Sequence, residues 1–104
     1  MNYKSKRWEH KRGVILKRDE YLCQESKRYG KSVQATTVHH IYPEEIYPEL
    51  TYENWNLISL SSSMHNAMHD RVTNEITSLG RQWQERVKDK FNEWMERNEA
   101  SPHL

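Results

Sequence analysis

Residues 36–43 read Thr-Thr-Val-His-His-Ile-Tyr-Pro, and this stretch determines how the rest of the chain is interpreted. Its β-branched residues predict a strand over residues 36–42 that stops at Pro43, which cannot donate a hydrogen bond to a sheet. Residues 56–60, Asn-Leu-Ile-Ser-Leu, predict a second strand. We expect the two strands to form a hairpin joined by a long loop over residues 43–55. A loop of that length in a compact domain is more often functional than incidental.

Two histidines follow the second strand at a spacing that suits a helix. Ser61, Ser62 and Ser63 offer N-caps for a helix that we expect from near residue 64 to about residue 72. His65 and His69 lie four residues apart, so both imidazoles would share one face of that helix. Two imidazoles at this spacing can bind one metal ion, and a third from a neighbouring strand would leave positions open for water or substrate. The spacing therefore predicts a catalytic metal rather than a structural one.

His39 and His40 are adjacent near the end of the first predicted strand. Neighbouring residues of a regular strand point to opposite faces, so the two rings cannot both face one metal without local distortion. This suggests that one histidine binds the metal. The other would contact a water molecule on the far side of a phosphate bound at that metal. A neutral imidazole, which titrates near pH 6.5, is well suited to take the proton of that water.

Helices are predicted on both sides of this segment. The first covers residues 5–19, with Ser5 as N-cap. The second covers residues 79–98, where apolar side chains recur three and four residues apart at Trp83, Val87, Phe91, Trp94 and Met95. The chain, residues 1–104, is then one α+β domain: a basic N-terminal arm (1–31), a strand–strand–helix segment (36–73) and a C-terminal amphipathic helix (79–98).

Charge is unevenly distributed along the 104 residues, although the net charge is only +1. Residues 1–31 hold ten Lys and Arg against four acids, and residues 32–70 hold five acids and no Lys or Arg. A basic arm of this kind suits contacts with phosphates, although a charge run is often only a solvated helix face. The lone Cys23, the absence of a bilayer-length apolar run and the lack of a signal-peptide pattern predict a soluble cytoplasmic protein without a membrane partner.

The motif formed by His39-His40-Ile41-Tyr42-Pro43, Asn56-Leu57 and His65-Asn66 resembles that of the HNH endonucleases. The wider pattern, from Ser5-Lys6-Arg7-Trp8 to Met68-His69-Asp70-Arg71, is similar to the small HNH proteins of tailed bacteriophages and prophages. The resemblance implies the ββα-metal fold, also called the His-Me finger, with flanking helices. It also implies a cytoplasmic setting in a bacterial host, and action in concert with the phage terminase and portal.

The resemblance assigns a role to each motif position. It implies that His39 and His65 bind one divalent cation (Mg²⁺, Mn²⁺, Ni²⁺ or Zn²⁺), that His69 is an additional ligand, that His40 is the general base and that Asn56 holds the base in place. The substrate would be DNA, cut with low sequence specificity because no element offers an obvious base-reading helix. We expect DNA contacts from the basic residues of the N-terminal helix and from one later arginine: Lys4, Lys6, Arg7, Lys11, Arg12, Lys17, Arg18 and Arg71.

The sequence departs from this family at one place. Phage members commonly carry two Cys-x-x-Cys pairs that hold a structural zinc, and the matching positions here are Cys23, Ser26, Ser61 and Met64. One thiol cannot complete a tetrahedral zinc site, so we expect no structural zinc. Packing around Met64, Leu60 and the C-terminal helix is expected to hold the scaffold instead.

Three other interpretations stay open. The chain could be a catalytically degenerate module, derived from an HNH nuclease, that still binds DNA or metal. The histidines could be solvated surface residues, although this requires four separate coincidences of placement. The substrate could be RNA rather than DNA.

Overall fold

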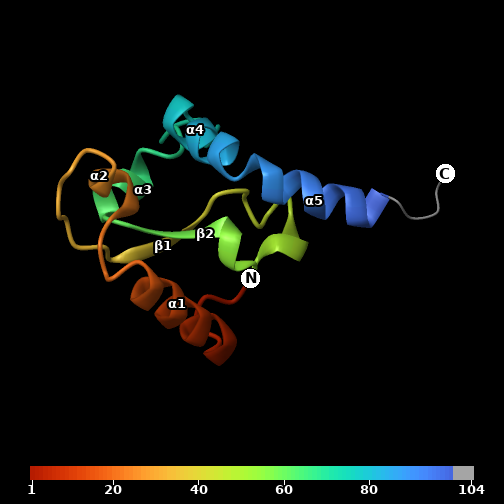
Figure 1. Ribbon diagram of the computed structural model, residues 1–104, viewed down its shortest axis with the longest axis horizontal. Helices are drawn as coiled ribbons and strands as arrows, with labels where there is room; N and C mark the ends of the chain where they lie inside the picture. The colour runs from red at the N-terminus through yellow and green to blue at the C-terminus, as the bar shows by residue number, and fades with distance from the viewer. Residues whose placement is uncertain (100–104) are drawn as a thin grey trace.

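The computed structural model describes residues 1–99 and forms an α+β fold, as the sequence predicts (Figure 1). The expected domain extends to residue 104, and its last five residues lie outside the described part. In chain order the elements are α1 (Lys6–Arg18), α2 (Gln24–Lys27), β1 (Thr37–His40), the 3₁₀ turns η1 (Pro48–Leu50) and η2 (Asn54–Asn56), β2 (Leu57–Leu60), α3 (Ser62–Asn66), α4 (Ser78–Arg86) and α5 (Lys88–Glu99). No helix in this range is long and apolar enough to span a bilayer.

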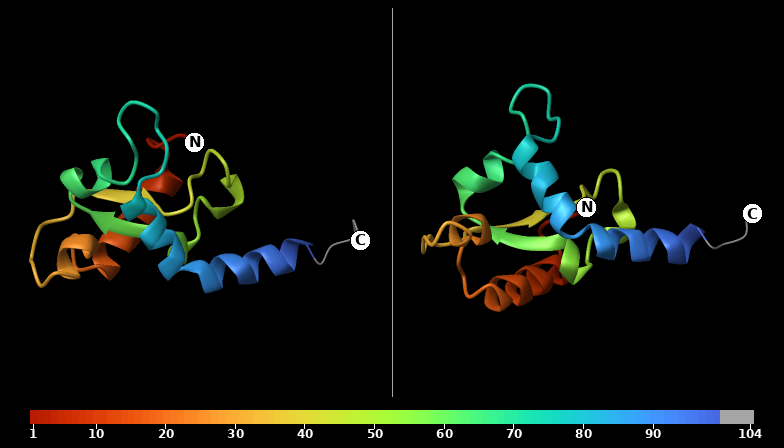
Figure 2. Two further views of the ribbon diagram at one scale, coloured as in Figure 1. Left: turned by 90° about the horizontal axis from the view of Figure 1, so that it is seen from above. Right: turned by 45° about the horizontal axis from the view of Figure 1, so that its top comes forward.

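The two strands form an antiparallel hairpin that is covered by helices on both faces (Figure 2). His39 lies opposite Ile58 and His40 lies opposite Leu57. Because side chains alternate along a strand, His40 and Leu57 face α1, whereas His39 and Ile58 face the side of α3 and α4. The predicted separation of the two histidines onto opposite faces is therefore confirmed.

Each face of the hairpin has its own apolar core. Helix α1 begins as expected, with the Ser5 hydroxyl accepting a hydrogen bond from the backbone N–H of Trp8 at 3.1 Å. The α1 side packs Trp8, Ile15, Leu16, Ala35, Val38 and Leu57 together. The opposite side packs Cys23, Ile41, Ile58, Leu60, Met68 and Trp83. The hairpin is thus buried between two layers, which cover its faces but not its two edges.

The outer edge of β2 is closed by two side chains from the end of α1. Arg18 donates to the carbonyl of Leu57 at 2.6 Å, and the buried carboxylate of Asp19 accepts from the backbone N–H of Ser59 at 3.0 Å. Arg18 also bridges to Asp19 and donates to the carbonyl of Asn54. Most of its donors are therefore engaged within the fold, although the Arg18 side chain is still 40% exposed. The contact with DNA that the sequence predicts for Arg18 stays a prediction.

The helix expected from residue 64 to 72 ends at Asn66. The hydroxyl of Thr77 donates to the carbonyls of Ala67 and Met68, at 2.7 and 3.1 Å, and so takes up carbonyls that a longer helix would have paired. The chain then turns into a loop closed by a bridge between His69 and Ile76. His65 and His69 consequently do not lie on one helix, and the predicted i, i+4 relationship is wrong as local structure.

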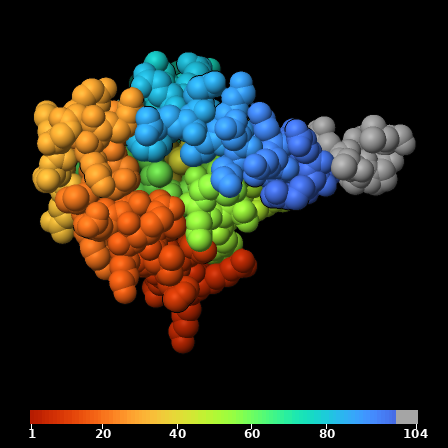
Figure 3. All heavy atoms as spheres, viewed as in Figure 1, coloured from red at the N-terminus to blue at the C-terminus, as the bar shows by residue number. Residues whose placement is uncertain are grey.

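The expected C-terminal helix over residues 79–98 is two helices: α4 ends at Arg86, Val87 leaves the helical conformation, and α5 begins at Lys88. Because of this break, the apolar side chains of α4 and those of α5 pack against different parts of the molecule. Trp83 of α4 is buried in the core beside Ile58, whereas Phe91 of α5 stacks on Tyr42 with ring centroids 4.1 Å apart. Helix α5 then projects away from the rest of the molecule (Figure 3). The short helix α2 was not predicted.

Candidate active site

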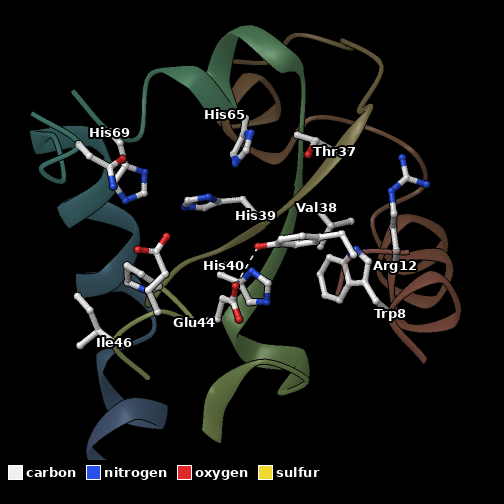
Figure 4. Close-up of a pocket in the computed structure, with 14 residues that line it drawn as sticks. Trp8, Arg12, Thr37, Val38, His39, His40, Glu44, Ile46, His65 and His69 are labelled. Atoms are coloured by element: carbon white, nitrogen blue, oxygen red, sulfur yellow. Dashed lines mark hydrogen bonds between the residues drawn. The ribbon is translucent and has the colours of Figure 1, made fainter. Parts of the chain in front are cut away.

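The open edge of β1 borders a cleft of about 580 Å³. All four residues of β1 line it, together with Trp8 and Arg12 of α1, the start of the loop after β1, His65 of α3 and His69 (Figure 4). Because the cleft runs along the free edge, side chains from both faces of β1 reach it. This explains how His39 and His40 point in opposite directions and still open onto one cavity.

His39, His65 and His69 gather on the α3 side of β1 (Figure 4). The ring centroid of His39 lies 5.2 Å from that of His65 and 6.0 Å from that of His69, with both rings edge-on to it. Burial, reinforced by the neighbouring imidazoles of His65, His69 and His40, lowers the pKa of His39 to about 3. His39 is therefore neutral at physiological pH, which is the form of imidazole that binds metals.

The donors of this cluster suit a borderline divalent cation, since three neutral imidazole nitrogens can converge from three segments of chain. Among the described side chains, no three His, Cys, Asp or Glu are already arranged as a complete metal cluster. His39 and His65 form the closer pair, and His69 lies farther from His39. The donor chemistry of the three residues therefore fits a cation, with His69 as the most distant member.

His40 occupies the α1 side of the strand and is nearly buried. Its ring stacks on the indole of Trp8, with centroids 5.1 Å apart, and its Nε2 lies 3.1 Å from the carbonyl oxygen of Thr51. A carbonyl can only accept, so Nε2 must carry the proton and Nδ1 keeps its lone pair. Burial lowers the pKa of His40, against the opposing effects of the Thr51 hydrogen bond and the charge of Glu44.

Asn56 is completely buried and ties the loop after β1 to the start of β2. Its Oδ1 accepts from the backbone N–H of Tyr42 at 2.7 Å, and its Nδ2 donates to the carbonyls of Tyr42 and Leu50, at 3.0 and 3.2 Å. Leu50 directly precedes Thr51, whose carbonyl holds His40. Asn56 thus fixes the segment that orients the candidate base, an arrangement that suits the positioning role implied by the sequence motif.

The basic residues predicted to contact DNA are not equivalent in the structure. Arg12 lines the cleft and donates to the carbonyl of Thr36 at 2.9 Å. Lys11 donates to the side chain of Asn54, and the Arg7 guanidinium lies 3.7 Å from the centroid of the Tyr52 ring. The side chains of Lys6 and Arg71 are exposed, and neither makes a hydrogen bond or ion pair within residues 1–98.

Sequence reasoning missed two residues that also line the cleft. The hydroxyl of Tyr3 donates to Oε1 of Glu44 at 3.2 Å, and the Tyr3 ring packs edge-on against Trp8. Glu44 is the residue immediately after Pro43, where the strand was expected to stop. The closeness of Glu44 to His39 and His40 in the sequence is the one signal that could have indicated that Glu44 lines the cleft.

The four positions that match the zinc ligands of phage relatives do come together. Burial raises the pKa of the Cys23 thiol, but hydrogen bonds from Ser26 and Ser61 outweigh it and lower that pKa overall. Met64 packs against the core that contains Cys23 and Leu60. The contacts at these positions are therefore a thiol–hydroxyl cluster and thioether packing, next to Trp83 of α4.

An antiparallel pair of strands followed by a short helix, with imidazoles from the first strand and the helix on one cleft, defines the ββα-metal class of fold. No protein-family model matches the sequence, and no curated protein matches it significantly. Among solved structures, the chain is similar to the HNH endonuclease of the deep-sea thermophilic bacteriophage GVE2, determined with a manganese ion. The two share 36% sequence identity with a TM-score of 0.60, over 62% of this chain and 70% of that one. This chain belongs to the HNH endonuclease family.

Proposed function

We propose that this protein is a metal-dependent endonuclease that hydrolyses phosphodiester bonds of DNA. The observation that carries the proposal is the pair His39 and His40, which leave β1 on opposite faces and open onto the same cleft. One face gathers two further imidazoles, and the other presents a single ring whose proton position is fixed. A cluster for a cation and a separate base on either side of one cavity is what hydrolysis of a phosphodiester requires.

His40 is proposed as the general base. Its Nδ1 takes a proton from a water molecule whose oxygen forms a bond to phosphorus, while the bond from phosphorus to the 3′ oxygen breaks. The carbonyl of Thr51 keeps Nε2 protonated and the Trp8 ring packs against the imidazole plane, so Nδ1 is the nitrogen left to accept the proton. Asn56 acts as a positioning residue through the loop that carries Thr51.

His39, His65 and His69 would hold a single divalent cation. Such a cation supplies positive charge that stabilises the phosphorane-like transition state and the departing oxygen. The manganese ion in the similar phage enzyme supports a divalent cation here. Imidazole donors favour Mn²⁺, Ni²⁺ or Zn²⁺, whereas Mg²⁺ prefers oxygen ligands and would rely on phosphate and water to complete its shell.

Affinity for DNA is proposed to come from Arg12 inside the cleft and from the exposed cations of α1 around it. These contacts reach phosphates and carry no sequence information, so binding should be weakly sequence-specific and steeply dependent on salt. The phage source of the similar structure supports a phage or prophage origin, and we extend the proposal to action beside the packaging terminase. Co-purification with the large terminase subunit of the same phage tests that extension.

Plasmid nicking tests the proposed function. Purified protein should convert supercoiled plasmid to open circles with added Mn²⁺, Ni²⁺, Mg²⁺ or Zn²⁺ and not with EDTA. His40→Ala should reduce the rate by about 10²–10⁴-fold while the protein stays folded. His10→Ala is the matched control, because His10 is exposed on α1 and does not line the cleft. A folded protein that binds DNA but cuts none with any of these metals would indicate the degenerate module instead, and cutting confined to RNA would change the substrate.

A further inference from the structure

The loop over residues 70–75, here called the projecting loop, stands out from the body between α3 and α4 (Figure 2). Its base is the bridge between His69 and Ile76. Both His69 and Asn74 line the cleft, so the loop rises directly from the rim beside the imidazole cluster. The cleft-facing side of the loop adjoins a second, smaller depression shared with Ile46, on the opposite rim.

The tip of the projecting loop presents an apolar side chain to solvent. Val72 is 93% exposed, and Ile46 across the rim is 66% exposed. These are the two most exposed large aliphatic side chains within residues 1–98; Ile46 lines the opening, and Val72 lies on the loop whose residues His69 and Asn74 line it. Arg71 stands beside Val72, and its guanidinium has no hydrogen bond or ion pair within that range. Neither Arg71 nor Val72 belongs to the two apolar cores of the described residues.

Internal hydrogen bonds hold the projecting loop in one shape. The Asp70 carboxylate accepts from the backbone N–H groups of Val72 and Thr73, at 2.8 and 2.9 Å, and its own backbone pairs with Glu75 and Asn74. Asn74 adopts a left-handed conformation with φ of 62°, which Asn tolerates better than most residues. The Asp70 carboxylate is thus occupied by its own loop, and Arg71 and Val72 are exposed there together with Thr73, Asn74 and Glu75.

We propose that the projecting loop is a wedge for duplex DNA: Val72 enters the minor groove against a base step while Arg71 contacts the flanking phosphate. Apolar side chains used in this way partly unstack a base step and bend the duplex, most easily at pyrimidine–purine steps. A duplex bent at the rim would lie deeper along the cleft beneath it. This inference rests on the proposed function, because it names the form of DNA that the same site accepts.

Binding in EDTA to a short duplex with a central TA step, and to one of its single strands, tests the wedge without cleavage. Val72→Ser should weaken duplex binding about tenfold, the scale expected for the lost burial of one valine side chain, and leave single-strand binding unchanged. Val72→Ile should retain duplex binding. Arg71→Gln should reduce the salt dependence by about one phosphate contact. Val33→Ser is the control, since Val33 is also exposed but lies outside α1 and the cleft lining.

The wedge and the proposed function fail in different ways. If Val72→Ser binds and bends the duplex as the unmodified protein does, while the unmodified protein nicks plasmid, the wedge is refuted and the nuclease stands. Equal weakening by Val33→Ser also refutes it. If Val72 governs duplex binding but no metal supports nicking, the wedge stands and the nuclease does not. Bending, read from energy transfer between dyes at the duplex ends, should fall in Val72→Ser.

Discussion

Replacing Asn56 with alanine should destabilise the fold by about 3 kcal/mol. The side chain makes three hydrogen bonds to the backbone in a fully buried position, and each such bond is worth about 1 kcal/mol net. For a domain of this size that cost lowers Tm by roughly 12–24 °C. The groups of Tyr42 and Leu50 left without partners are also free to shift, and with them the carbonyl of Thr51 that holds His40.

Urea unfolding followed by tryptophan fluorescence measures the first effect, and nicking per folded molecule measures the second. Asn54→Ala is the matched control: Asn54 lies on the same 3₁₀ turn, but its side chain is exposed and accepts one hydrogen bond from Lys11. That variant should lose about 0.5 kcal/mol or less. If Asn56→Ala unfolds at the same urea concentration as Asn54→Ala, the reasoning about this amide is refuted. If it is destabilised but nicks at the normal rate per folded molecule, only its positioning role fails.

Three further predictions follow from the same contacts. Added Mn²⁺ or Ni²⁺ should raise the Tm of the unmodified protein and of His10→Ala but not that of His65→Ala, as thermal melting with and without EDTA would show; an equal rise in all three would place the metal elsewhere. Arg18→Gln should lose about 1–2 kcal/mol of stability in urea titrations because it opens the edge of β2, yet leave the salt dependence of DNA binding unchanged, whereas Lys17→Gln should do the reverse. In a His65→Ala background, replacing the three neighbours of Cys23 with cysteine (Ser26→Cys, Ser61→Cys and Met64→Cys) should create a zinc site. This variant should retain one zinc after dialysis and melt at a higher temperature with zinc than with EDTA. Loss of that zinc would show that these positions are too far apart to share a metal.

The sequence was sufficient where a local rule and the tertiary contacts agree. Ser5 caps α1 through its hydroxyl, as its residue type and position predict, and the two strands form where β-branched and aliphatic residues predict them. The opposite directions of His39 and His40 follow from the alternation of side chains alone, so the sequence by itself predicts this part of the candidate site.

The sequence was insufficient where a distant side chain decides the local structure. Thr77 ends α3 from eleven residues beyond Asn66, and no periodicity in residues 64–72 records that contact. His69 nevertheless reaches His39, because the loop that follows α3 returns it to the cluster. Arg18 shows the same limit: its position in a basic helix gives no sign that it also donates to the carbonyl of Leu57 at the edge of β2.

The placement of the candidate site follows from how a two-stranded sheet disposes of its edges. A sheet of two strands has two open edges, and each presents backbone groups that must be paired, covered or left to solvent. Arg18 and Asp19 pair with the backbone at the outer edge of β2, so the contacts at that edge stabilise the fold. The edge of β1 carries no such closure within the described residues and lines the cleft along its whole length. Because β1 is buried on both faces and open only at this edge, its two adjacent histidines can be held in dry, separate environments and still meet one substrate.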